Sequence, residues 1–388
     1  MRGHVSPRRA LLALGALIAC LIGPATASAE EAFTPIVAQP IAPARAVVAT
    51  DGKKHVAYEL LVSNYSSAPT TIKRIDRFDG RRRLAPVTGE AISGMLKPFA
   101  SAPGTDVLGP GQSGFILLDL ALPRRAKLPT RISHQFVVGK SDAPLKFVSK
   151  FRTGTVRVLG DPAVQVRPPL VGPGWVVANG CCAEFTSHRG AVLPVNGRFH
   201  NSERFAIDFM QIQPDGLLVN GAWESLDNYP FFGDPILSAT RGTVVRVVKD
   251  IPETQPSGNL PPASAARAGG NYVVVRSARK RFAFYAHMQP GSARVKVGQR
   301  VRAGQILGLL GSTGNSNAPH LHFHMMDGPD PLASNGIPYT FSRFGVQGRL
   351  LNFGDLFDGV KAQVNSQFAG IHSNQLPLNL QVIDFPNR

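Results

Sequence analysis

The stretch of sequence that decides the fold is Ala318-Pro319-His320-Leu321-His322-Phe323-His324. Its polar and apolar residues alternate, which is typical of a β-strand whose successive side chains point to opposite faces of a sheet. His320, His322 and His324 should therefore share one face, while Leu321 and Phe323 point into the core. Three neighbouring imidazoles would repel one another if protonated and add nothing to packing. The stretch therefore predicts a metal site or a catalytic task rather than a polar strand surface.

Two other apolar segments each contain one residue that could join such a site. The segment 204–209 places Asp208 among apolar residues, and a buried carboxylate there needs either a metal ion or an arginine as its partner. The segment 282–288 places His287 near the end of an alternating strand, where a single histidine is more often structural. Six of the ten histidines of the chain lie between His188 and His324, however, which favours one shared site.

The composition indicates a mainly β protein with two domains. The chain has 39 Gly and 32 Pro and only 17% charged residues, which favours strands and turns over long helices. Its 388 residues are enough for two separate cores. We expect a small β-sandwich-like domain over 30–165 and a second domain over 166–388, joined at the proline-rich segment 167–174. The glycine-punctuated stretch 295–308 predicts a series of short hairpins.

Residues 1–29 have the pattern of a secretion signal. Three arginines precede an apolar stretch over 10–23, and small residues at 27–29 form a cleavage pattern. We therefore expect export to the periplasm or the extracellular space. A lipoprotein site at Cys20 is the alternative, although the apolar run continues past it. No later segment approaches the roughly 20 apolar residues that a membrane span needs, so no integral membrane segment is expected after signal removal.

The formal net charge of +17 favours an anionic partner. Outside the cytoplasm that partner would be peptidoglycan, another envelope polymer or lipid headgroups. Nucleic acid is not expected, because no aromatic and basic residues are interleaved in the manner that stacks bases. The charge could also serve solubility alone. Cys181 and Cys182 are the only cysteines after residue 29, and their redox state is left open.

Taken together, the motifs resemble the lysostaphin-like (LytM-like) M23 metallopeptidases. The order is an Asp in an apolar strand, Tyr285-Ala286-His287, a Gly-rich stretch over 311–315, and His-Leu-His-Phe over 320–323. The resemblance covers roughly 176–344 and leaves a C-terminal extension. It implies antiparallel β-sheets with a groove, of the duplicated hybrid motif type. It also implies one zinc ion per chain and hydrolysis of peptide bonds in peptidoglycan stems or cross-bridges.

The resemblance also implies individual roles for the candidate residues. Asp208 and His322 would bind zinc, while His287 and His320 would be catalytic without binding it. Three protein ligands would leave a fourth position for water, whose pKa the zinc lowers toward about 7. The two other histidines could orient this water, accept its proton and stabilise the oxyanion.

The first zinc ligand departs from the family pattern. The family usually carries it four residues before the Asp, a position held here by Arg204, whose guanidinium cannot ligate a metal. His188 and His200 are the upstream candidates. We favour His188, because 188–197 resembles a subgroup of the family with a hairpin inserted between this His and the Asp; His200 lies inside the insertion.

His324 is the second departure, because the family commonly has Glu at this position. His324 could support a neighbouring ligand or line the groove. A catalytically silent binding or regulatory module of the envelope is the main alternative to an enzyme, and a structural envelope protein that works through its N-terminal domain is another. The complete ligand set favours the enzyme.

Overall fold

The computed structural model describes residues 1, 3, 31–99, 101, 103–139, 143–256, 264 and 267–387. The predicted signal peptide, including Cys20, lies outside them apart from residues 1 and 3. The described part consists mainly of strands, and its helical segments are α1 (Glu90–Ser93), η1 (Leu226–Asn228) and η2 (Gly354–Asp358). The prediction of a mainly β protein is confirmed. None of these helices has the length and apolar character needed to cross a membrane.

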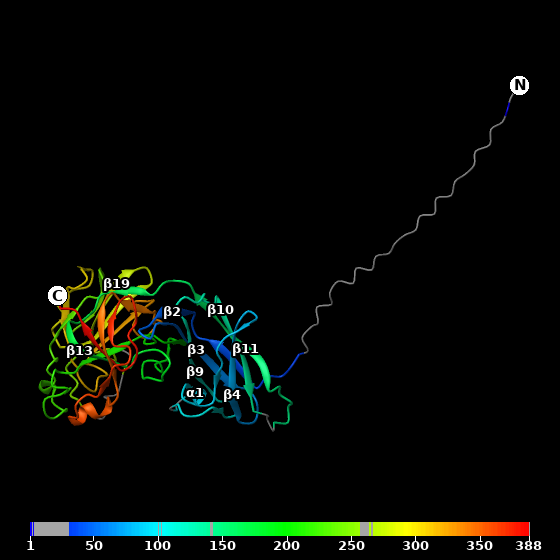
Figure 1. The fold of residues 1–388 in the computed structure, drawn as a ribbon, viewed down its shortest axis with the longest axis horizontal. Helices are drawn as coiled ribbons and strands as arrows, with labels where there is room; N and C mark the ends of the chain where they lie inside the picture. Colours follow the sequence, from blue (N-terminus) through cyan, green and yellow to red (C-terminus); the bar gives the residue numbers. More distant parts are fainter. Residues whose placement is uncertain are drawn as a thin grey trace.

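The first eleven strands form one sheet, which we call the N-terminal sheet (Figure 1). Its order is β5-β4-β10-β11-β2-β3-β9-β7, with β1 on β3 and both β6 and β8 on β4. Its core joins residues from both halves of this order, as a sandwich does. The strands are β1 (Ile36–Pro40), β2 (Ala44–Val48), β3 (Lys53–Asn64), β4 (Thr70–Asp79), β5 (Arg82–Arg83), β6 (Val87–Thr88), β7 (Leu96–Pro98), β8 (Val107–Leu108), β9 (Ser113–Pro123), β10 (Arg131–Val138) and β11 (Lys150–Leu159).

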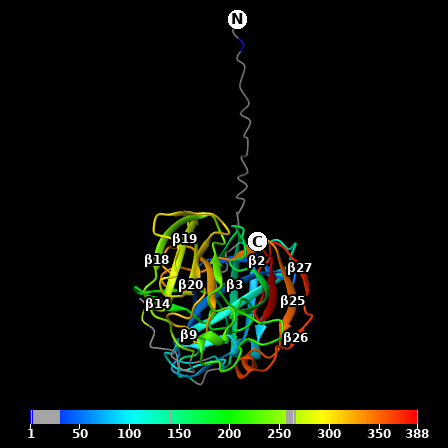
Figure 2. The ribbon, with the colours of Figure 1, turned by 90° about the vertical axis from the view of Figure 1, so that its left-hand side faces the viewer.

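A second large sheet, the C-terminal sheet, has the order β21-β18-β19-β20-β23-β16-β13-β28-β25-β26, with β27 on β25. Figure 2 shows its two ends, with β18, β19 and β20 on one side and β25, β26 and β27 on the other. Its strands are β13 (Gly172–Ala178), β16 (Ile207–Gln211), β18 (Gly242–Val248), β19 (Asn271–Ala278), β20 (Arg281–Met288), β21 (Arg300–Val301), β23 (Leu321–Met326), β25 (Phe344–Leu350), β26 (Val364–Asn365), β27 (Gly370–His372) and β28 (Gln381–Phe385).

Three two-stranded sheets complete the fold. They pair β12 (Val164–Val166) with β24 (Tyr339–Phe341), β14 (Leu193–Val195) with β15 (Arg198–His200), and β17 (Pro235–Leu237) with β22 (Ile306–Leu309). The hairpin series predicted over 295–308 is wrong, because β21 pairs with β18 and β22 pairs with β17. Distant strands satisfy the backbone hydrogen bonds that local hairpins would have made.

The N-terminal and C-terminal parts contact each other just after β2, where two residues meet the segment that leads into β28 and its first residue. The amide of Gln375 donates to the Ala49 carbonyl at 2.8 Å, and the Thr50 hydroxyl donates to the Gln381 side-chain oxygen at 2.8 Å. The expected boundary between residues 165 and 166 falls inside β12, and the domain limits stay a prediction. Cys181 and Cys182, whose redox state was left open, are joined by a disulfide.

Strand β23 lies at the centre of the C-terminal sheet, between β20 and β16. Its apolar residues Leu321 and Phe323 are completely buried, as the alternation predicted. The Phe323 ring contacts Tyr339, with ring centroids 5.1 Å apart. Strand β23 begins at Leu321, so His320 lies just before it. The opposite face of the strand is thereby free to carry the polar residues of the site.

Replacing Phe323 by Ala should destabilise the whole C-terminal sheet. The change leaves a cavity in the core, and we expect the free energy of unfolding to fall by about 3–5 kcal/mol in urea denaturation. Val297→Ala is the matched control, since Val297 is 61% exposed and should change this free energy by no more than about 0.5 kcal/mol. A loss below about 1 kcal/mol for Phe323→Ala would contradict the core assignment.

Candidate metal centre

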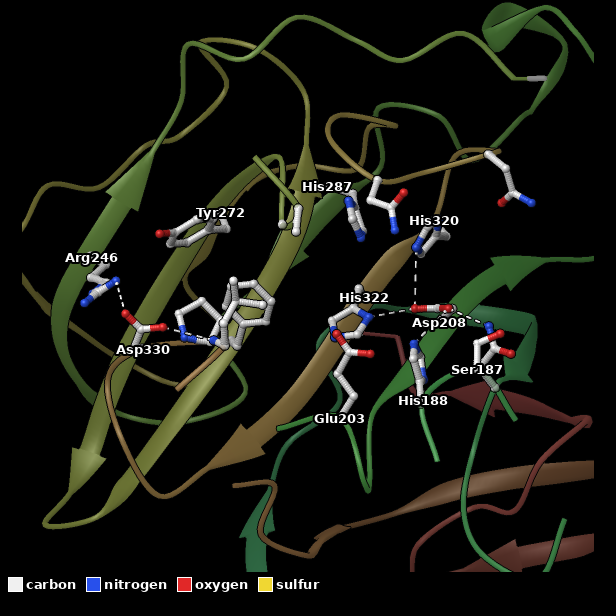
Figure 3. Close-up of a pocket in the computed structure, with 18 residues that line it drawn as sticks. Ser187, His188, Glu203, Asp208, Arg246, Tyr272, His287, His320, His322 and Asp330 are labelled. Atoms are coloured by element: carbon white, nitrogen blue, oxygen red, sulfur yellow. Dashed lines mark hydrogen bonds and ion pairs between the residues drawn. The ribbon is translucent and has the colours of Figure 1, made fainter. Parts of the chain in front are cut away.

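All five residues predicted for the site line one cavity of about 470 Å³ (Figure 3). They are His188, Asp208, His287, His320 and His322. Neither His200 nor His324 is among the lining residues. His200 is half-buried on β15, in the hairpin between His188 and Asp208. The structure thus brings the favoured set together and leaves His200 outside it.

The pairing of three strands places these residues side by side. His322 on β23 lies opposite Asp208 on β16 and opposite Ala286 on β20. His287 follows Ala286 directly, so it reaches the same end of the sheet. His188 comes from the loop after β13 and meets the others from outside the sheet.

Asp208 is the centre of this group. Its Oδ1 lies 2.9 Å from Nδ1 of His322 and 3.4 Å from Nε2 of His320. Its Oδ2 accepts a hydrogen bond from the Asn179 amide at 2.8 Å and lies 3.2 Å from Nε2 of His188. Burial raises the pKa of Asp208, but the neighbouring His188 and His320 outweigh it and hold the pKa well below its usual value. The carboxylate is therefore charged.

His188, Asp208 and His322 have the arrangement of metal ligands. Their three ligand atoms lie within 4.8 Å of one another, and all three residues are buried. Two ligands of one tetrahedral zinc ion, each bonded at about 2.0–2.2 Å, lie about 3.3 Å apart. The separations of 2.9 and 3.2 Å from Asp208 to its two histidines are close to this value. Two imidazoles and a carboxylate are also donors that zinc accepts, so these residues fit a zinc ion.

His324 supports His322 rather than lining the cavity. Its Nδ1 lies 2.9 Å from Nε2 of His322. A His322 that offers Nδ1 to a metal must carry its proton on Nε2, and His324 Nδ1 would then accept that proton in a hydrogen bond. Burial lowers the pKa of His324 well below its usual value, which keeps this acceptor neutral.

His287 and His320 each present an unprotonated Nε2 atom. Nδ1 of His287 lies 2.6 Å from the Thr313 carbonyl, and Nδ1 of His320 lies 2.8 Å from the Ala318 carbonyl. A carbonyl oxygen only accepts, so both Nδ1 atoms carry the hydrogen. Burial, with further contributions from neighbouring histidines, lowers the pKa of both rings, that of His287 well below its usual value. Both rings are therefore neutral bases near pH 7.

Two residues that the sequence analysis missed help to build the site. Gly270 adopts φ +57°, and a Cβ there would lie 2.2 Å from the Thr313 carbonyl oxygen, so only glycine allows Thr313 to reach His287. Asn179, with φ 58°, donates to Asp208. The Asn179-Gly180 dipeptide signals a turn after an apolar strand, but not the contact, which depends on the pairing of β13 with β16.

Arg204, at the position where the family usually carries its first ligand, is not among the residues that line the cavity. Its Nε lies 2.9 Å from both carboxylate oxygens of Glu59 on β3. The upstream position of the first ligand is thus consistent with the structure, and the hairpin of β14 and β15 lies where the insertion was expected. Membership of the subgroup with this insertion stays a prediction.

Comparison with known proteins gives the same family for the C-terminal part. The model of peptidase family M23 matches residues 223–334, which include His287, His320 and His322 but neither His188 nor Asp208. The glycyl-glycine endopeptidase ALE-1 of Staphylococcus capitis is 40% identical over 87 residues, 22% of each chain. The peptidoglycan DD-endopeptidase ShyC of Vibrio cholerae is 38% identical over 69 residues, 18% of this chain and 16% of the relative.

Lysostaphin of Staphylococcus simulans is 46% identical over 59 residues, 15% of this chain and 12% of the relative. Its solved catalytic domain aligns at 23% identity and a TM-score of 0.24, over 43% of this chain and 88% of that domain. The matched segments span about a fifth or less of the length of these curated relatives. On the family match and these relatives, the chain carries a peptidase domain of family M23.

Proposed function

We propose that this chain is an exported zinc endopeptidase that hydrolyses peptide bonds in the stems or cross-bridges of peptidoglycan. The observation that carries the proposal is the grouping of His188, Asp208 and His322 around one point, with two neutral histidines beside it. Several relatives of the matched segment are named as peptidoglycan or glycyl-glycine endopeptidases, which supports this substrate class.

His188 through Nε2, Asp208 through its carboxylate and His322 through Nδ1 would hold a single zinc ion. Bound there, zinc would lower the pKa of a water molecule and polarise the carbonyl of the scissile peptide bond. Asp208 supplies the one negative charge of the ligand set, and Asn179 fixes its Oδ2 atom. With its proton on Nε2 and donated to His324 Nδ1, His322 would offer Nδ1 to the metal.

His320 and His287 would move the proton and orient the reactants. Both present Nε2 to the cavity, and their ring centroids lie 4.5 Å apart. Nε2 of His320 lies 3.4 Å from Asp208, near enough to the ligands to accept a proton from the attacking water. The protonated Nε2 of His320 would then return this proton to the leaving amine, while the unprotonated Nε2 of His287 would accept a hydrogen bond from the attacking water and orient it.

The substrate would extend from the metal ligands along the cavity. Tyr272 lines it further away, and Arg246 and Asp330 form an ion pair of 3.1 Å there. Peptidoglycan is an anionic polymer that a chain of net charge +17 would attract. This substrate lies outside the cytoplasm, in accord with the signal pattern of residues 1–29, and either a periplasmic or an extracellular location fits.

Zinc content should depend on His188 and not on His200. We expect one zinc per chain by elemental analysis in the wild type, and none in Asp208→Ala or His188→Ala, because each variant loses a ligand atom. His200→Ala is the matched control and should keep its zinc, since this side chain lies outside the cavity. If only His200→Ala loses its zinc and His188→Ala keeps it, the first ligand is His200 and not His188.

Zinc affinity should fall in acid. Burial lowers the pKa of His188, but the charge of Asp208 outweighs this effect. In the metal-free protein the pKa of His188 is therefore raised to about 9. Zinc must therefore displace a proton from His188 at neutral pH, and we expect the affinity to drop about tenfold per pH unit below this value. Titration of zinc against a chelator between pH 6 and 9 measures the slope. A zinc affinity that does not change between pH 6 and 9 would contradict the pairing of a protonated His188 with Asp208.

The two neutral histidines should be needed for activity but not for zinc. We expect His320→Ala and His287→Ala to keep one zinc per chain and to lose activity by about 10²–10⁴-fold, the usual contribution of a general acid or base. Release of new amino groups from purified peptidoglycan measures the activity, with His200→Ala as the active control. If the zinc-loaded wild type binds peptidoglycan but releases no amino groups, the proposed endopeptidase activity is wrong. That result would favour a binding module.

A further inference from the structure

The N-terminal sheet contributes a buried carboxylate that contacts the residue next to His188. Glu59 on β3 is 0% exposed, and it contacts two arginines of the C-terminal part, Arg189 and Arg204, which are 0% and 3% exposed. Arg204 Nε lies 2.9 Å from both oxygens of Glu59, and Arg189 donates to Oε1 at 3.1 Å. The Asn201 amide also donates to Oε1, at 3.3 Å. One acidic residue thus holds three side chains from a single segment.

This segment, 188–204, connects two of the three metal ligands. Arg189 directly follows His188, and Arg204 lies four residues before Asp208. Glu59 therefore holds the segment close to both of its ends. Within the segment only the short hairpin of β14 and β15 makes regular strand pairing, and neither strand joins a large sheet. His188 is consequently a ligand without a sheet of its own to fix it.

Other contacts dock the same segment on the N-terminal sheet. Lys97 Nζ donates to the Gly190 carbonyl at 3.1 Å, and Arg189 also donates to the Leu118 carbonyl at 3.1 Å. Phe199 packs edge-on against Phe115 with ring centroids 4.9 Å apart. These contacts come from β7 and β9, so the docking surface spans three strands of that sheet.

A chain of hydrogen bonds links the docked segment to the ligands. The backbone amide of Arg189 donates to the Thr186 hydroxyl at 3.2 Å, and that hydroxyl donates to the Asn179 carbonyl at 3.0 Å. The Asn179 amide then donates to Asp208. A shift of Arg189 would thus disturb the ligand beside it and, through Asn179, the central carboxylate.

Buried ion pairs cost desolvation free energy and are held only where every charge is well satisfied, so they fix geometry more than they add stability. We propose that Glu59 is a positioning residue of the metal centre: through Arg189 and Arg204 it fixes the segment that points His188 at Asp208. The proposal rests on the zinc site of the proposed function. The N-terminal sheet is then an integral part of the metal centre.

The test compares zinc affinity in Glu59→Gln with two controls in the full chain. Glu59→Gln keeps the shape of the side chain and removes its charge. Phe136→Leu is the control for stability, because this completely buried ring belongs to the N-terminal core and not to the docking surface. Glu90→Gln is the control for charge, on an exposed residue of α1. Zinc dissociation constants come from chelator competition, and hydrogen exchange reports the mobility of 186–206.

We expect Glu59→Gln to weaken zinc binding at least tenfold and to speed exchange in 186–206. Phe136→Leu should lower the thermal midpoint and leave zinc affinity unchanged, and Glu90→Gln should change neither. Wild-type affinity in a folded Glu59→Gln would overturn the positioning role and leave the zinc enzyme intact. A wild type that binds no zinc would overturn both proposals.

A second pair of variants carries the test if Glu59→Gln does not fold. Glu59→Asp keeps the charge but withdraws it from both arginines, and Arg189→Lys keeps the charge but loses the planar fork. Each variant should weaken zinc binding several-fold. Within 186–206, hydrogen exchange should speed up most near residue 189. Wild-type zinc affinity in both variants would overturn the proposal.

Discussion

The charge of Asp208 is the constraint around which the site is organised. It lines the cavity and is only 6% exposed, and an unpaired carboxylate would be too costly to maintain there. Its two oxygens meet one amide and three imidazoles, which hold its pKa far below the usual value. The same negative charge raises the pKa of His188, so in the metal-free protein a proton occupies the position that a divalent cation would take. A metal ion bound at this site would therefore have to displace that proton.

The register of the strands places the partners that the buried Asp208 carboxylate needs at defined positions. Because β23 pairs with β16 and β20 at once, His322 has Asp208 on one side and the strand end that carries His287 on the other. A shift of one residue in either pairing would turn His322 into the core and Phe323 toward the cavity. The buried contacts of Phe323 with Tyr285 and Tyr339 resist that shift, so the apolar face of the strand fixes its polar face.

The parts of the site that a sequence can predict are those set by local periodicity. The alternation over 320–324 predicted which residues face the core, and the polar residues of three apolar segments predicted Asp208, His287 and His322, which line one cavity. Long-range pairing was beyond such reasoning. The stretch 295–308 looked like a set of hairpins, but its strands pair with β17 and β18. Asn179 and Glu59 were missed for the same reason, since each acts on residues 29 or more positions away. Local patterns carry no information about such distant partners.

Arg204 shows how the lack of a metal ligand at one position can require a further contact elsewhere to fix the ligand that takes its place. An arginine four residues before Asp208 cannot bind a metal, so the first ligand would have to come from a loop that is not held by the sheet. A loop ligand is free to move and loses conformational entropy when it binds, which weakens metal binding unless the loop is fixed beforehand. Arg204 and Arg189 meet this need together, because Glu59 binds both and so anchors the loop at its two ends. Arg204 therefore occupies the position where a ligand could have come from the sheet, and it also helps to hold the segment that carries His188 in its place.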